Sequence, residues 1–227
     1  MARTRNHAAH ALRREAFVDA AQRLIQTKGY EQMSIQDVLD DLDTSRGAFY
    51  HYFDSKAALL EAVIERMVDG ALHAVEPVVA DPDLAALDKL TRLIEGIGQW
   101  KAQRTELVLG ILSVWLADDN AIVRDKFRRG VQARLAPMLA LIVQQGREEG
   151  VFTAGPPDQV ARVLVTVLLG ANEAATDLYF ARQAGTIDFD EVLRTLGAYA
   201  AACERILGLA PGSFPIFDTD VLRRWYG

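Results

Sequence analysis

Apolar residues recur at intervals of three and four along nearly the whole chain, the spacing that places them on one face of a helix. Short alternating runs of β-branched residues bounded by tight turns, the pattern typical of strands, are missing. The pattern predicts an all-α protein with about nine helices. Their expected ranges are 11–28, 35–42, 46–52, 56–77, 84–100, 104–117, 121–148, 158–182 and 188–208. The aromatic-rich tail, 211–227, is expected to dock on the body of the protein.

The pattern also suggests how the chain is divided. Pro77 and Pro82 end the long fourth helix and separate it from the next one. We expect two domains, residues 1–56 and residues 57–227, connected by the helix that begins near Lys56. The second domain is long enough to bury a sizeable core of its own.

Residues 29–60 are the most informative segment. Ser34 and Asp37 form a capping-box pattern, which predicts the start of a helix. The apolar residues of the next two turns share one face and are Ile35, Val38, Leu39 and Leu42. A short turn, 43–45, leads to a second short helix that Thr44 or Ser45 is free to cap. Two short helices joined by a tight turn form the helix-turn-helix layout.

The second short helix is predicted to have two chemically different faces. The inward face carries three aromatic residues, Phe49, Tyr52 and Phe53. The outward face carries Arg46, Gly47, Tyr50 and His51. An arginine can bond a guanine edge or a phosphate, and a glycine lets the backbone approach closely, so this face suits a DNA groove. An alternative stays open here, because an outward tyrosine and histidine could simply pack on a neighbouring helix.

The charge distribution changes what the overall charge suggests. The chain has 25 basic and 31 acidic residues and a formal net charge of −6, which by itself argues against a nucleic-acid partner. Residues 1–56, however, hold eight residues of each sign, so the excess acid lies in the rest of the chain. The first fourteen residues contain no acid and four arginines, Arg3, Arg5, Arg13 and Arg14. They form either a basic arm that follows DNA or an unstructured solubilising tail.

Residues from about 13 to 62 resemble the N-terminal DNA-binding domain of the TetR family of bacterial transcriptional regulators. The matching features are Ala20-Ala21 with Leu24, Gly29-Tyr30, Ser34-Ile35, the run 45–53, Ser55-Lys56 and Leu59-Leu60. The rest of the chain is similar in architecture only. The resemblance implies a three-helix DNA-binding domain followed by a C-terminal helical bundle for ligand binding and dimerisation. One departure is Asp43, which stands where the family commonly has Gly and which can adopt a left-handed conformation at modest cost.

The resemblance also implies roles for individual residues. It places the helix around 46–52 in the major groove. The residues expected nearest the base edges are Ser45, Arg46 and Gly47. The residues expected to hold phosphates are Thr44, Tyr50, His51 and Lys56. Gln36 matches a position that can reach a base.

The C-terminal half offers a surface for a dimer. Small residues are closely spaced in the last two long helices: Gly170, Ala171, Ala174 and Ala175 in one, and Gly197, Ala198 and Ala200–Ala202 in the other. In the family these two helices form a four-helix bundle across a twofold axis. We therefore expect a homodimer that binds a palindromic operator in double-stranded DNA. Close packing within one monomer is the alternative.

In the family this half also encloses a small-molecule effector. The residues that we expect to contact it are Trp100, Trp115, Asn172 and Asp177. Asn172, Glu173 and Asp177 interrupt an otherwise apolar helix. Since unpaired burial of polar groups is costly, these three are exposed, hydrogen-bonded or lining a pocket.

Other classes of protein find little support. The four histidines, His7, His10, His51 and His73, show no catalytic or metal-binding motif, so we expect no enzyme activity, cofactor or metal site. The single cysteine suggests a reducing compartment. No signal peptide is visible, and the apolar runs fall short of the roughly 20 residues of a membrane span, so we expect a cytoplasmic protein with no membrane partner.

The expected function is that of a DNA-binding transcriptional regulator, a repressor that an unknown small-molecule effector releases from its operator. The alternative is a ligand-binding helical scaffold dimer without DNA-binding activity. Arg46, Tyr50 and Lys56 favour the first, because a scaffold has no need of them.

Overall fold

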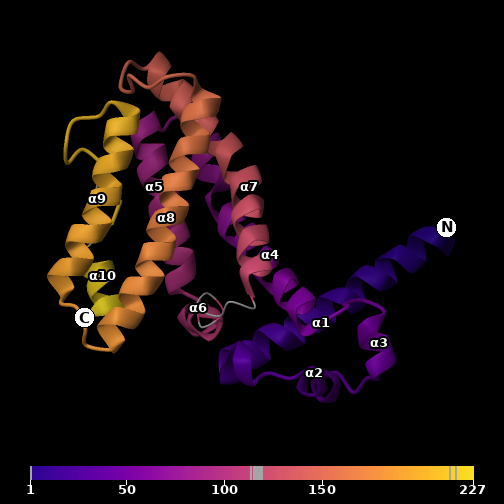
Figure 1. The fold of residues 1–227 in the computed structure, drawn as a ribbon. Helices are drawn as coiled ribbons and strands as arrows, with labels where there is room; N and C mark the ends of the chain where they lie inside the picture. Colours follow the sequence, from indigo (N-terminus) through magenta and orange to yellow (C-terminus); the bar gives the residue numbers. More distant parts are fainter. Residues whose placement is uncertain (1, 113, 115–119, 215, 218) are drawn as a thin grey trace. The chain divides into compact units, whose positions relative to one another are not determined.

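The computed structural model describes residues 2–112, 114, 120–214, 216–217 and 219–227, with side chains from residue 9 onward. The described residues form ten α-helices and no strand, which confirms the all-α class (Figure 1). They divide into two compact units. The N-terminal unit comprises residues 1–69 and 101–127, and the C-terminal unit comprises residues 70–100 and 128–227. This division follows packing, and the domain boundary expected at residue 56 stays a prediction.

The N-terminal unit is built on a long first helix. Its helices are α1 (Ala2–Gln32), α2 (Ile35–Asp41), α3 (Arg46–Tyr50), the first half of α4 (Lys56–Ala80) and α6 (Thr105–Leu112). The fully buried side chains at its centre include Phe17, Ile25, Phe49, Leu59, Leu60 and Leu107. Phe17 meets Phe49 edge to face, with ring centroids 5.7 Å apart. An aromatic contact between α1 and α3 therefore fixes the helix-turn-helix on its support.

Three described helix ends differ from the expectation by three residues or more. α1 begins at Ala2 and not at residue 11, so the stretch expected to be an unstructured arm is helical; its alanines and arginines are strong helix formers. Gly29, the expected end of this helix, is a kink with φ 78°. α4 continues past Pro77 to Ala80, since the fixed φ of proline is compatible with a helix and the cost is the one hydrogen bond that Pro77 cannot donate to the preceding turn. For the helix expected over 104–117, residues 115–117 are not among the residues that the structure describes.

The start of α2 has the predicted capping box. The backbone N–H of Asp37 donates to Ser34 Oγ at 3.1 Å, and Ser34 N–H donates to the Asp37 carboxylate at 2.7 Å. Lys28 forms an ion pair with the same carboxylate at 2.7 Å. Hydrogen bonds from Lys28 and Ser34 hold the pKa of Asp37 well below its ordinary value.

The turn between α2 and α3 has the backbone that the sequence suggested. Asp43 has φ 45° and is the non-glycine residue with positive φ among those described. Thr44 N–H donates to Leu39 O at 3.0 Å, which closes the turn. Asp41, whose charge at the end of α2 opposes the helix dipole, pairs with Arg23 at 2.6 Å. That ion pair offsets the unfavourable position of the carboxylate.

The C-terminal unit contains most of α5 (Ala86–Ala102) and α7 (Ala121–Glu148), together with α8 (Pro157–Gln183) and α9 (Phe189–Leu207). The last two lie side by side (Figure 1). A Cβ added to Gly170 of α8 would lie 3.3 Å from the Tyr199 ring of α9, so this glycine serves close packing inside one chain. Glu149 accepts a hydrogen bond from Ala86 N–H at 3.0 Å and thereby caps α5 from the end of α7.

The aromatic tail forms a tenth helix, α10 (Thr219–Tyr226), which packs on α8 and α9 as its predicted docking requires. Tyr226 donates its hydroxyl to Ala175 O at 2.9 Å, and Arg182 Nε donates to Tyr226 O at 2.8 Å. Phe214 N–H donates to the buried carboxylate of Glu204 at 2.9 Å. The sequence pattern missed this helix because it has only two turns.

Candidate DNA-binding surface

The helix α3, which is expected to lie in the major groove and is called the reading helix below, has the two faces that its spacing predicts. Phe49 is fully buried and Phe53 nearly so, whereas Arg46 and Gly47 are exposed. Tyr50 keeps 47% of its surface exposed. Its ring meets Phe49 edge to face at 5.3 Å, so the phenol is supported from below and its hydroxyl end is open to a partner. The Arg46–Tyr50 stripe therefore does not pack inside the protein.

The start of α3 is held locally by Ser45. Its side chain accepts a hydrogen bond from Ala48 N–H at 3.2 Å, the N-cap arrangement. The helix has only five residues, so its stability comes from this cap and from the buried aromatic face more than from propensity. These two supports fix the direction in which the outward face points.

Gly47 has no packing reason to be glycine. Its backbone is helical, and a Cβ built on it would meet one atom within 4 Å, Ser45 Oγ at 3.9 Å. Glycine in a helix costs about 0.5–1 kcal/mol relative to alanine. Glycine lowers the stability of the helix here and gains no packing contact in return. Such a residue points to a functional requirement, here the close approach of another molecule to the backbone.

The other expected contact residues already have partners inside the chain. Gln36 donates to Asp40 at 2.7 Å, and Arg13 donates to Thr44 Oγ1 at 2.9 Å. The His51 ring lies 5.0 Å from that of Tyr52 in an edge contact. The packing alternative considered for the outward tyrosine and histidine thus holds in part for His51 and not for Tyr50. All these side chains keep a polar atom that can donate to DNA.

Lys56 at the start of α4 lies on an aromatic ring. Its Nζ is 4.1 Å from the centroid of Tyr30 and donates to Glu31 O at 3.3 Å. Partial burial lowers the pKa of Lys56, while the charges of Glu31 and Asp37 act in the opposite direction. A phosphate can use the remaining N–H donors of this ammonium. The sequence analysis identified Lys56 but not the Tyr30 ring on which it lies. The available signal for that ring was the Gly29-Tyr30 pair.

The structure describes three of the four residues expected to contact an effector: Trp100 on α5, and Asn172 and Asp177 on α8. Trp100 is half-buried and faces Gly70, whose Cβ position lies 3.0 Å from its ring. Asn172 is half-buried and Asp177 exposed, and Trp115 lies outside the described residues. Glu173 is exposed and pairs with Arg128 at 3.7 Å. Contact of these residues with an effector stays a prediction.

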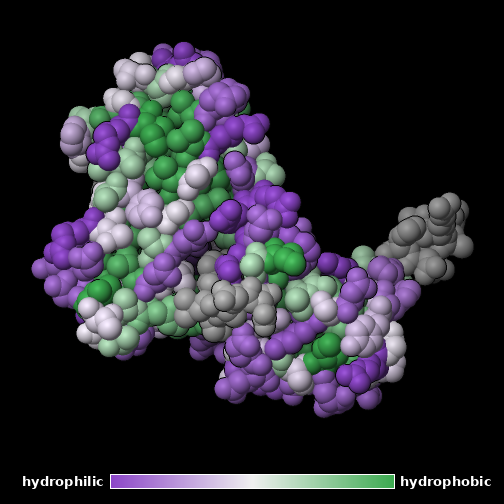
Figure 2. All heavy atoms as spheres, in the orientation of Figure 1, coloured by the Kyte–Doolittle hydropathy of each residue, from purple (hydrophilic) through white to green (hydrophobic). Residues whose placement is uncertain are grey.

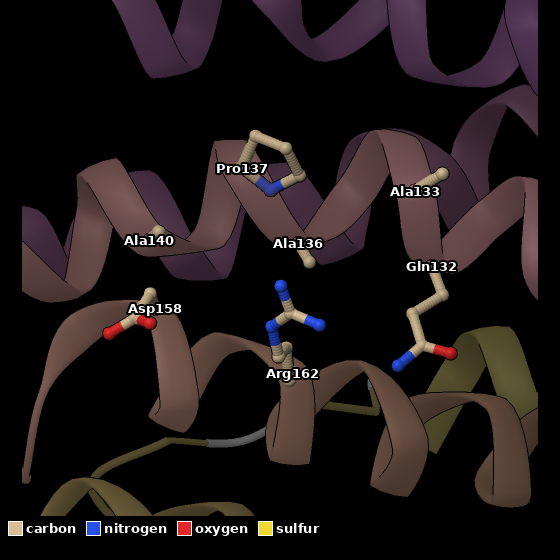
Figure 3. A pocket seen from close by; sticks show the side chains of 7 residues that line it. All are labelled: Gln132, Ala133, Ala136, Pro137, Ala140, Asp158 and Arg162. Carbon is tan, nitrogen blue, oxygen red and sulfur yellow. The ribbon is translucent and has the colours of Figure 1, made fainter.

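A small pocket opens between α7 and α8, and none of those residues lines it. Its walls are Gln132, Ala133, Ala136, Pro137, Ala140, Asp158 and Arg162. The Arg162 guanidinium points across it toward α7 (Figure 3). Its volume of about 220 Å³ is below the range of pockets that enclose a drug-sized ligand. Among the described residues no cluster of three potential metal ligands occurs.

Comparisons with known proteins agree with this geometry. Residues 17–63 match the family model described as bacterial regulatory proteins, tetR family. The regulator EthR of Mycolicibacterium smegmatis is 29% identical over 146 residues, 57% of this chain and 67% of that protein. The repressor NemR of Escherichia coli K12 is 29% identical over 168 residues, 70% of this chain and 81% of that protein. These relatives are transcriptional regulators and not enzymes.

A solved structure shares the fold over most of the chain. A TetR-family protein of Syntrophomonas wolfei superposes with a TM-score of 0.59 at 20% identity and covers 88% of this chain and 97% of that one. At this identity the likeness concerns the fold alone. The matched segment contains the helix-turn-helix whose outward face is described above, and the two named regulators extend the likeness well beyond it. Over residues 17–63 this chain therefore resembles the TetR family of bacterial regulatory proteins.

Proposed function

We propose that this protein is a cytoplasmic, homodimeric transcriptional repressor. Each protomer inserts α3 into the major groove of one half of a palindromic operator. A small-molecule effector, whose identity is open, releases the dimer from the DNA. The expectation of a repressor is supported by the relatives named as repressors, NemR of Escherichia coli among them.

The observation that carries the proposal is the outward face of α3. Gly47 leaves the backbone bare beside two exposed hydrogen-bonding side chains, Arg46 and Tyr50. An arginine at the start of a reading helix can donate two hydrogen bonds to a guanine edge, and the bare backbone permits the approach that this requires.

A dimer is supported by the surface of α8. Its apolar stretch is long enough to cross a membrane by length and composition, although only 22% of it is buried within one chain. Apolar side chains gather over this helix on the face shown in Figure 2. On α9, Gly197 and Ala198 are exposed, and a Cβ on Gly197 would meet nothing within 4 Å. A second copy of the chain that packs on α8 and α9 would cover this apolar surface. No lipid bilayer is then needed to cover it.

The DNA-binding test is selection of bound duplexes from a random pool, followed by affinity measurements with variants. Gly47→Ala should weaken binding to the selected duplex at least tenfold and leave the thermal midpoint equal or higher. Gly98→Ala in α5 is the matched control, because a Cβ there would meet nothing within 4 Å. Arg46→Ala should cost about 1–3 kcal/mol and relax the preference at one base position. Failure to enrich any duplex in dilute salt would favour the scaffold alternative.

The dimer test is light scattering without DNA. The wild-type protein should give about twice the chain mass of 25.0 kDa. Gly197→Leu should lower that mass toward one chain, because the new side chain has room in a monomer and not in a close helix contact. A wild-type mass near 25 kDa at micromolar concentration would contradict the proposed dimer.

A further inference from the structure

The first helix contacts the reading helix at both of its ends. The His10 ring lies 5.5 Å from that of His51, the C-cap of α3. One turn further along α1, Arg13 Nη2 donates to Thr44 Oγ1 at 2.9 Å, immediately before the N-cap Ser45. α1 is thus more than a scaffold beneath α3, since its side chains contact residues that are expected to face phosphates.

Arg13 differs from the other cations of α1 whose side chains the structure describes. Three of these cations form an ion pair with a carboxylate: Arg14 with Glu15 at 3.6 Å, Arg23 with Asp41 at 2.6 Å and Lys28 with Asp37 at 2.7 Å. Arg13 donates to a neutral hydroxyl instead, and within the described part of the chain no carboxylate neutralises it. Its guanidinium carbon lies 5.8 Å from the centroid of the buried Phe17 ring, so the group is held in place.

This hydrogen bond has a consequence for Thr44. The backbone of Thr44 is fixed by its bond to Leu39 O. Its hydroxyl can donate one hydrogen bond and accept two. Since Arg13 occupies a lone pair of the oxygen, the hydroxyl proton is left to be donated elsewhere. A charged donor also polarises the hydroxyl and strengthens the bond that it donates in turn.

We propose that Arg13 is a positioning residue for DNA binding that acts through Thr44. It holds the hydroxyl as a hydrogen-bond donor toward an operator phosphate, and its own charge lies one hydrogen bond away from that phosphate. The inference rests on the proposed function, because it needs the helix-turn-helix to meet a duplex. It assigns to α1 a part in binding that the outward face of α3 does not supply.

A double-mutant cycle on the selected duplex tests the proposal. Arg13→Gln and Thr44→Val should each weaken binding about tenfold, the lower end of the range for one hydrogen bond with a charged partner. The double variant should be no more than about twofold weaker than the weaker single variant, because both changes remove the same contact. Thr44→Ser keeps the hydroxyl and should bind within about twofold of wild type. Arg13→Lys keeps a charged donor and should restore most of the affinity.

Arg14→Gln is the matched control, since it removes the same charge one residue along α1 from a cation that already pairs with Glu15. It should change the affinity less than about twofold, and all variants should unfold within a few degrees of wild type. Losses that multiply in the double variant would overturn the proposal, as would an equal loss in Arg14→Gln or full affinity in Arg13→Gln. A wild-type protein that binds no duplex would instead overturn the proposed function itself.

Discussion

The contact between α1 and α6 can be tested by adding a single carbon. A Cβ on Gly110 of α6 would lie 2.5 Å from the carbonyl oxygen of Ile25 and 3.2 Å from its carbonyl carbon. Both atoms belong to the backbone of α1, so no side-chain rotation can relieve the clash. Gly110→Ala therefore forces the two helices apart or displaces the end of α6.

The magnitude follows from two opposing terms. Overpacking of this kind typically costs about 1–3 kcal/mol, and a backbone neighbour at 2.5 Å places Gly110 at the upper end. Replacing glycine by alanine in a helix returns about 1 kcal/mol of propensity. The expected net loss is about 2 kcal/mol. For a chain of this length that lowers the Tm by roughly 4–8 °C, since each kcal/mol corresponds to about 2–4 °C.

Thermal unfolding followed by circular dichroism measures this loss, with urea unfolding as a second measurement. Gly98→Ala is the control, because its Cβ position is open and only the propensity term acts. It should raise the Tm by a few degrees at most. A Gly110→Ala protein that matches or exceeds the wild-type Tm would refute the close approach of α6 to α1.

Three further predictions concern single side chains. Lys56→Ala should weaken binding to all duplexes alike and lower the salt slope by about one unit; a loss confined to one sequence would contradict the phosphate role. Asp37→Asn should destabilise the protein most near neutral pH. The lowered pKa of Asp37 contributes stability that is present above its unfolded pKa of about 4 and lost as the pH falls further, so the difference in Tm between variant and wild type should shrink toward pH 3. Cys203 should react with iodoacetamide at pH 8 at least about 100-fold more slowly than glutathione, because the thiol is 1% exposed and burial raises its pKa to about 11; rapid alkylation of the folded protein would show that α9 opens.

The long helices of the C-terminal unit could be predicted from the sequence to within a residue or two. α7 was expected over 121–148 and spans Ala121–Glu148. α8 and α9 each differ by one residue at their ends, since proline, glycine and aspartate mark those boundaries. α10 was missed because two turns give too few positions for a helical period to stand out. The start of α1 was misplaced because its first turns have no apolar face, and periodicity has nothing to detect there.

The reading face could be predicted because its residues lie within one helix. Phe49 inward and Arg46 outward follow from helical spacing alone. The partners of Thr44 and Lys56 could not be predicted, because Arg13 and Tyr30 contact them from a different element, 31 and 26 positions away. Asp43 is the intermediate case. The family resemblance, in which a glycine commonly stands at this position, implied a residue able to adopt the left-handed conformation, and Asp43 has φ 45°.

The anchoring of α10 makes its last turn matter for the rest of the C-terminal unit. Arg182 Nε donates to Tyr226 O, and Leu178 and Leu196 are covered by the same helix. A truncation that removed the last turn of α10 would take away this acceptor, although Arg182 Nη1 would keep its bond to Ile187 O, and it would expose the two leucines. Such surfaces lead to aggregation and to recognition by quality-control proteases, so a late truncation would act through lower abundance of the protein in the cell.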